Sequence, residues 1–110
     1  MKTHILYIGL NAEINIIMQR LINGHDGWEG FVAASGEEAI LLFHQHTFDV
    51  VLLGNGMDEE EERKLRAIFT RQHPDVIIIE HYGGGSGLLE NEIREALDNR
   101  KPGLNFQDNF

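Results

Sequence analysis

The chain has 110 residues, and 18 acidic against nine basic side chains give it a formal net charge of −9. This length suits a single core, so we expect one domain over residues 1–100 and a short tail over residues 101–110. An acidic surface repels phosphate backbones, which argues against a nucleic-acid partner. No apolar run reaches the roughly 20 residues of a membrane helix, no signal-peptide pattern is present, and cysteine is absent. We therefore expect a cytoplasmic protein without membrane association, disulfides or thiolate chemistry.

The first part of the chain alternates strand and helix patterns. Residues 5–8 are all apolar and predict a strand, and Asn11 is a good N-cap for a helix that Gly24 ends. The helical period predicts that the buried face of this helix consists of Ile14, Ile17, Met18, Leu21 and Ile22. Residues 31–34 predict a second, shorter strand, which we place at an edge of the sheet.

The middle of the chain repeats this alternation. Ser35 and Glu38 have the spacing of a capping box at the start of a second helix, whose predicted inner residues are Ala39, Leu42 and Phe43. Residues 50–53 form an unbroken apolar run, which is typical of a parallel strand covered on both faces. Asp58 opens a third helix with four glutamates in its first turn, where the helix dipole favours carboxylates. Its predicted inner residues are Leu65, Ile68 and Phe69.

The last strand–helix unit follows Pro74. Residues 76–79 predict a very apolar fourth strand, and a glycine-rich loop then leads into a helix predicted over residues 88–99. The inner stripe of this helix is predicted to contain Leu89, Ile93, Ala96 and Leu97. Four successive strand–helix units predict an α/β fold with a doubly wound parallel sheet.

Three segments carry a resemblance to a known family. They are KTHILYIGLN at the first strand, SGEEAI at the start of the second helix and FDVVLLGNGM at the third strand. In residue sequence and spacing, these segments resemble the receiver domains of response regulators over roughly the first 80 residues. The resemblance implies a flavodoxin- or CheY-like fold with four or five strands, truncated at its C-terminal end.

The resemblance also implies where receiver chemistry would lie, and this chain lacks the side chains for it. The family ends its first strand in acidic residues, where this chain has Gly9 and Leu10, and its third strand in a phosphoacceptor aspartate, where this chain has Gly54. Glu80 stands where the family has a threonine or serine. Receivers need the aspartate as nucleophile and clustered carboxylates for Mg²⁺. We therefore predict a degenerate receiver, or pseudo-receiver, that is not an enzyme and has no catalytic residue, cofactor or metal.

After Glu80 the chain is too short for the helix, strand and helix that complete a receiver, so two interpretations are open. In the one that we favour, LLENEIREAL resembles the family's last helix, and both faces of the sheet are covered. In the other, LLENEIREAL is the family's fourth helix and GLNFQ is a remnant of the fifth strand.

A glycine-rich loop is the main remaining candidate for binding. Its N–H groups precede a helix and suit an anion, so the alternative function is a nucleotide- or phosphate-metabolite-binding domain that uses Gly83, Gly84, Gly85, Ser86 and Gly87. The loop lacks the lysine of a P-loop. Glu13, Asp58 and Glu80 are better explained as solvated acids than as a displaced cation site, and the six histidines show no metal-binding spacing.

Together these patterns favour a pseudo-receiver in two-component-like signal transduction, the setting of phosphorelay proteins. We expect it to act through protein–protein interaction, with a signalling component as the partner. The truncation would expose a strand edge or an apolar patch, and we predict homodimerisation through that surface.

Overall fold

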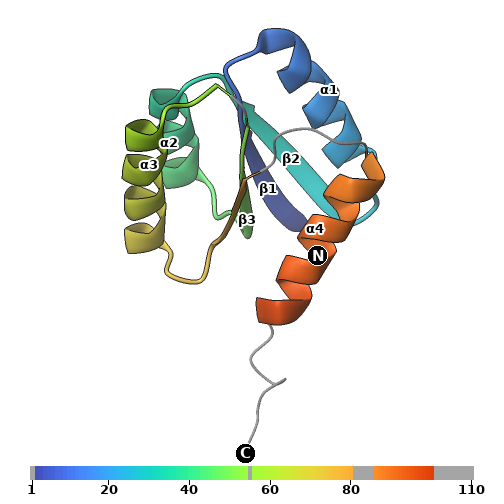
Figure 1. Cartoon of the computed structure of the whole chain (residues 1–110). Helices are drawn as coiled ribbons and strands as arrows, with labels where there is room; N and C mark the ends of the chain where they lie inside the picture. The colour runs from blue at the N-terminus through green and yellow to red at the C-terminus, as the bar shows by residue number, and fades with distance from the viewer. Residues whose placement is uncertain (1, 55, 81–85, 101–110) are drawn as a thin grey trace, which may run out of the picture.

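The computed structural model describes residues 2–54, 56–80 and 86–100, which form a sheet between two layers of helices (Figure 1). In chain order the elements are β1 (Thr3–Ile8), α1 (Ala12–Asn23), β2 (Trp28–Ala33), α2 (Gly36–Gln45), β3 (Val50–Leu53), α3 (Glu59–Gln72), β4 (Ile77–Glu80) and α4 (Ser86–Arg100). Within these residues, no helix has both the length and the apolar character to cross a membrane.

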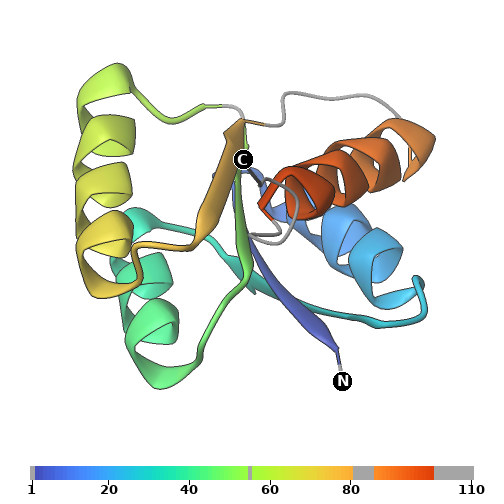
Figure 2. The same ribbon diagram turned by 90° about the horizontal axis from the view of Figure 1, so that it is seen from below.

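The four strands lie in the order β2-β1-β3-β4, and every neighbouring pair is parallel. Figure 2 shows α2 and α3 on one face of this sheet and α1 and α4 on the other. Such an arrangement is a doubly wound α/β fold with the strand order of flavodoxin- and CheY-like proteins, which confirms the predicted fold class. The two faces have separate cores, one built on Leu6, Phe43 and Phe69 and the other on Ile5, Ile22 and Leu52.

The predicted helix starts are confirmed by their hydrogen bonds. The side chains of Asn11, Ser35 and Asp58 accept from the backbone N–H three residues later, at 3.0, 3.1 and 2.7 Å. Each therefore satisfies one of the N–H groups that a helix start leaves without a partner in the helix. Glu38 reaches back as predicted, and its Oε1 accepts from the N–H of Ala34 at 2.7 Å.

Two details of the first strand–helix–strand unit differ from the prediction. Strand β2 is an edge strand as expected, but it starts at Trp28 because that residue pairs with Thr3 across the ladder. Helix α1 is rotated from its predicted orientation, so Ile14 and Ile17 are 43% and 52% exposed. The buried Asn15 explains the rotation, because its Nδ2 donates to the backbone oxygen of Gly9 at 2.8 Å.

Helix α4 packs on the same face of the sheet as α1. Its Ile93 is fully buried in the cluster that contains Met18 and Ile22 of α1. His25, between α1 and β2, lies 3.4 Å from Glu90 through its Nε2. This position agrees with the favoured interpretation, in which the last helix covers the second face of the sheet, whereas the GLNFQ segment of the rival interpretation lies outside the described residues.

Candidate functional site

The register of the strands brings the predicted site positions together at one edge of the sheet. Ile8 of β1 is level with Leu53 of β3, and Leu53 is level with Glu80 of β4. Gly9 and Gly54 therefore follow their strands side by side, and the N–H of Gly54 donates to the oxygen of Ile8 at 2.8 Å. This carboxyl edge is where open α/β sheets place their chemistry.

The ring of Tyr7 occupies the space beside both glycines. A Cβ at Gly54 would lie 2.3 Å from the Tyr7 hydroxyl oxygen and 3.0 Å from the backbone oxygen of Ile8. A Cβ at Gly9 would lie 2.6 Å from Cε2 of the same ring and 2.5 Å from Oδ1 of Asn15. Glycine at both positions is therefore a packing requirement of this site, because a larger side chain would overlap atoms already there.

The groups around the two glycines are neutral. Tyr7 is only 3% exposed, and burial raises the pKa of its phenol above the usual value of about 10. The amide oxygen of Asn15 is buried without a hydrogen-bond partner among the described residues. A neutral phenol and an amide supply none of the clustered carboxylates that Mg²⁺ prefers.

Glu80, the last residue of β4, is drawn toward helix α3. Its Oε2 lies 3.1 Å from Nη2 of Arg66, whose Nε is 3.3 Å from Oε2 of Glu62. The arginine therefore bridges two carboxylates at the end of the strand. An acidic group paired in this way joins β4 to α3, and its negative charge, unlike a hydroxyl, would repel a phosphoryl group nearby.

The other predicted candidates do not assemble into a site. Over the described parts of the chain, no three histidine, aspartate or glutamate side chains are close enough to hold a metal ion. Asp58 uses one carboxylate oxygen to cap α3, and Glu13 lies exposed in the first turn of α1. Of the glycine-rich loop, Ser86 and Gly87 begin α4, and residues 83–85 lie outside the described residues.

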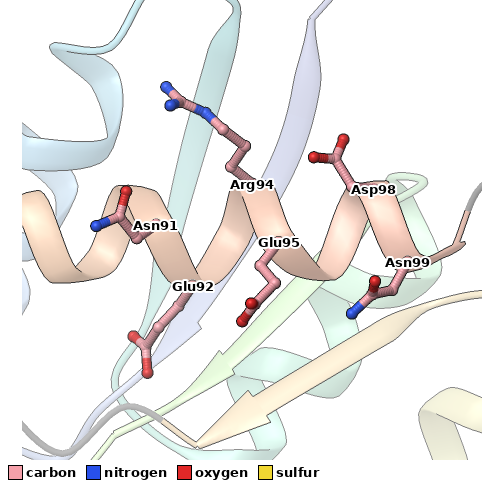
Figure 3. Close-up of a pocket in the computed structure, with 6 residues that line it drawn as sticks. All are labelled: Asn91, Glu92, Arg94, Glu95, Asp98 and Asn99. Carbon is pink, nitrogen blue, oxygen red and sulfur yellow. The ribbon is translucent and has the colours of Figure 1, made fainter.

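Three pockets are found among the described residues; the smallest, of about 210 Å³, lies between the ends of α2 and α3, and the two larger ones are not built ligand sites. One, of about 410 Å³, lies between the starts of α2 and α3, but Ser35 and Asp58 in its wall are already used as helix caps. The other, of about 610 Å³, is lined by α4 alone. In Figure 3 its side chains diverge, with Arg94 on one side of the helix and Glu92 and Glu95 on the other.

Tyr7, Asn15 and Arg66 are the site residues that sequence reasoning missed. A signal was available for the first of them, since Tyr7 is the one large polar-tipped residue in an apolar strand and is followed two positions later by glycine. Residues two apart on a strand point to the same face, so Gly9 leaves room beside the ring. Nothing in the local pattern indicated that Gly54, on another strand, shares that space.

Comparison with known proteins identifies the fold. No protein-family model matches the chain, and neither does any curated protein. Among solved structures, the chain is similar to a CheY-like response regulator receiver domain from Methanospirillum hungatei JF-1, with a TM-score of 0.80, 15% identity, and coverage of 91% of this chain and 97% of that one.

Two further structures give the same result. The signal receiver domain of an HD domain-containing protein from Pseudomonas fluorescens Pf-5 matches with a TM-score of 0.78 and 16% identity over 91% of this chain and 98% of that one. CheY6 from R. sphaeroides, in complex with the phosphorylated P1 domain of CheA3, matches with a TM-score of 0.68 and 15% identity over 87% and 97%. The chain thus has the fold of receiver domains, at only 15–16% sequence identity to these three structures.

Proposed function

We propose that the chain is a pseudo-receiver: a receiver-fold module of two-component-like signalling that works by protein–protein contact and transfers no phosphoryl group. The single observation that carries this proposal is the overlap between the Tyr7 ring and the position of a Cβ on Gly54, at 2.3 Å from the hydroxyl oxygen. The space from which a phosphoacceptor side chain would project is already filled.

Phosphoryl transfer to a carboxylate has two requirements that this edge of the sheet does not meet. The first is a carboxylate nucleophile, and the residue after β3 is glycine. The second is a divalent cation that neutralises the charge on the transferred group. Gly9 and Leu10 offer no side-chain oxygen, and Glu80 is engaged with Arg66. The module would therefore act as a constitutive binding surface and not as an enzyme.

The partner in this proposal is a signalling protein. One structural neighbour, CheY6, is in complex with a CheA3 domain, so the fold supports docking of such a partner. The net charge of −9 disfavours nucleic acid, and we place the module in the cytoplasm. Homodimerisation is part of the same proposal.

The test is an amide NMR titration with Mg²⁺, then beryllofluoride, then a nucleotide panel. The proposal expects no saturable shifts at residues 9–13 and 54–58, with a phosphorylatable receiver as positive control. Saturable shifts there with Mg²⁺ and beryllofluoride would mean a relocated phospho-switch and would overturn it. Shifts confined to residues 83–89 with a nucleotide would support the alternative, a nucleotide- or phosphate-metabolite-binding domain.

A pair of variants distinguishes a site that the Tyr7 ring blocks sterically from a site that lacks only the carboxylate. Gly54→Asp restores the missing carboxylate but places it against the Tyr7 ring, so we expect no response to beryllofluoride. Tyr7→Val/Gly54→Asp restores the carboxylate and removes the ring. Beryllofluoride shifts in Gly54→Asp alone would show that Tyr7 does not close the site, which would remove the observation on which the proposal rests.

A further inference from the structure

Strand β2 forms one edge of the sheet, and its ladder with β1 determines which of its backbone groups face outward. Just before β2 the N–H of Thr3 donates to the oxygen of Gly27 at 2.7 Å, and at the end of the strand the N–H of Gly9 donates to the oxygen of Ala33 at 3.1 Å. Along a parallel strand, the N–H and C=O of every second residue point the same way. The odd-numbered residues of β2 therefore face β1, and the even-numbered residues face away from the sheet.

The middle of this outer edge is occupied by the side chain of Asn23, the last residue of α1. Its Oδ1 accepts from the N–H of Gly30 at 2.8 Å, and its Nδ2 donates to the oxygen of Gly30 at a longer distance of 3.5 Å. An amide side chain carries one acceptor and donors in nearly the same arrangement as a peptide group. Asn23 therefore takes the place that the backbone of a neighbouring strand would take at Gly30.

The outward N–H groups on either side of Gly30 are also bonded within the chain. The N–H of Trp28, at the start of β2, donates to the oxygen of His25 at 3.2 Å. The N–H of Ala34, directly after β2, donates to Oε1 of Glu38 at 2.7 Å. A strand that approached this edge would therefore find the donors at both ends and in the middle already used.

Glycine at position 30 allows the end of α1 to come this close to the strand. A Cβ on Gly30 would lie 2.6 Å from Cγ2 of Ile22 and 3.7 Å from Oδ1 of Asn23. Ile22 is fully buried, so a larger residue at position 30 would displace it and move the end of the helix away from β2. The missing side chain of Gly30 thus makes room for the amide of Asn23.

We infer that Asn23 prevents β2 from pairing with a strand of another molecule. An edge strand with unpaired backbone groups is a template for strand addition, and proteins commonly protect such edges. The sequence of β2, WEGFVA, is suited to pairing, because it has a single charge and contains aromatic and β-branched residues. This inference goes beyond the proposed function. It implies that the homodimer proposed above forms through a surface other than the β2 edge.

Sedimentation equilibrium on the whole chain compares Asn23→Ala with Gln19→Ala. Both substitutions remove an amide side chain from α1, but that of Gln19 lies exposed on the helix. We expect Asn23→Ala to associate at least about tenfold more tightly than the parent, because the backbone groups of Gly30 become available to another strand. Gln19→Ala should behave like the parent. An Asn23→Ala protein whose mass equals that of the parent up to millimolar concentration overturns the inference.

Hydrogen exchange identifies the surface that associates. In the parent, the N–H of Gly30 should be protected at every concentration, because Asn23 accepts from it. In dilute Asn23→Ala this N–H should exchange at least about tenfold faster, and it should regain protection together with the N–H of Val32 as the concentration rises. A parent in which Gly30 exchanges like an exposed amide overturns the inference. So does association of Asn23→Ala without renewed protection at Gly30, because the contact is then elsewhere.

Alanine is the best helix former, so Asn23→Ala is expected to keep the fold. If it does not fold, Asn23→Ser replaces it with the same expected and contrary results, since a serine side chain is too short to reach Gly30. These measurements are independent of the proposed function. They report on the β2 edge, whereas the beryllofluoride titration reports on residues 9–13 and 54–58.

Discussion

Strands β3 and β4 are nearly the same in sequence character but differ in their surroundings. Each has four residues, VVLL and IIIE, and they lie next to each other in parallel register. Every residue of β3 is buried because β1 and β4 flank it, whereas β4 has a strand on one side only among the described elements. Apolar composition thus marks a strand as belonging to the sheet but does not say whether it lies at the centre or the edge.

The two strands also end differently, and this bears on function. β3 ends at Gly54, where the Tyr7 ring fills the neighbouring space, and β4 ends at Glu80, which Arg66 holds against α3. The space beside Gly54 is filled by the Tyr7 ring, while among the described strands β4 has a neighbour on one side only. The filled space beside Gly54 is the observation on which the pseudo-receiver proposed above rests.

The largest expected effect compares the two strands directly. Leu53→Ala removes a side chain that is fully buried in β3, and Ile78→Ala shortens one that is partly exposed in β4. We expect the free energy of unfolding to fall by about 3 kcal/mol for Leu53→Ala and by roughly 1 kcal/mol for Ile78→Ala, since the cost follows buried volume. Urea unfolding at one fixed protein concentration measures both. Equal losses would show that β4 is buried in solution as deeply as β3.

The next effect concerns the closed end of β3. Gly54→Ala adds a Cβ that meets Tyr7 and the Ile8 carbonyl, so we expect a loss of about 2 kcal/mol from overpacking. In a Tyr7→Leu background the same substitution should cost less, and a double-mutant cycle gives the coupling. The contact with the Ile8 carbonyl remains in that background, so Gly54→Ala should still cost some stability. Independent, additive effects would mean that the ring does not occupy this space.

The ends of β3 and β4 show how much of the structure could be predicted from the sequence. The apolar runs, the caps Asn11, Ser35 and Asp58, and the parallel order of the sheet follow from local pattern, and all are confirmed. The positions of Gly9 and Gly54 at the carboxyl edge followed from the resemblance to receivers. What occupies that edge depends on contacts between residues far apart in the chain, which a local pattern does not encode.

Helix α1 illustrates the same limit. The period of its apolar residues predicted Ile14 and Ile17 inside, but the buried Asn15 bonds to the Gly9 carbonyl and turns the helix. A buried backbone oxygen without a hydrogen-bond partner costs free energy, and the amide of Asn15 supplies that partner here while Ile14 and Ile17 stay exposed. Sequence reasoning ranks such a residue as exposed, because asparagine is usually found on the surface.

The burial of the Tyr7 phenol predicts that stability depends on pH in the alkaline range. Burial raises the pKa of its phenol in the folded protein, so the folded state keeps a proton that the unfolded state loses above pH of about 10. Stability is therefore expected to fall as pH rises from about 10 through the folded pKa, with no contribution from this group at neutral pH. Unfolding of the parent and of Tyr7→Phe should differ in alkaline slope, and the phenylalanine variant should lose less. If the unfolding free energies of the two proteins depend on pH in the same way above pH of about 10, the Tyr7 hydroxyl is exposed to water.

The smallest effect concerns the end of β4. Glu80→Gln removes the charge that Arg66 contacts, but both side chains are more than a third exposed, so we expect a loss of only about 0.5 kcal/mol. The loss should shrink in high salt, because exposed charges are screened. Glu29→Gln on the opposite edge strand β2 is the matched control, since its carboxylate contacts His4 and is similarly exposed. A loss above 2 kcal/mol for Glu80→Gln alone, unchanged by salt, would mean that the end of β4 is shielded from water.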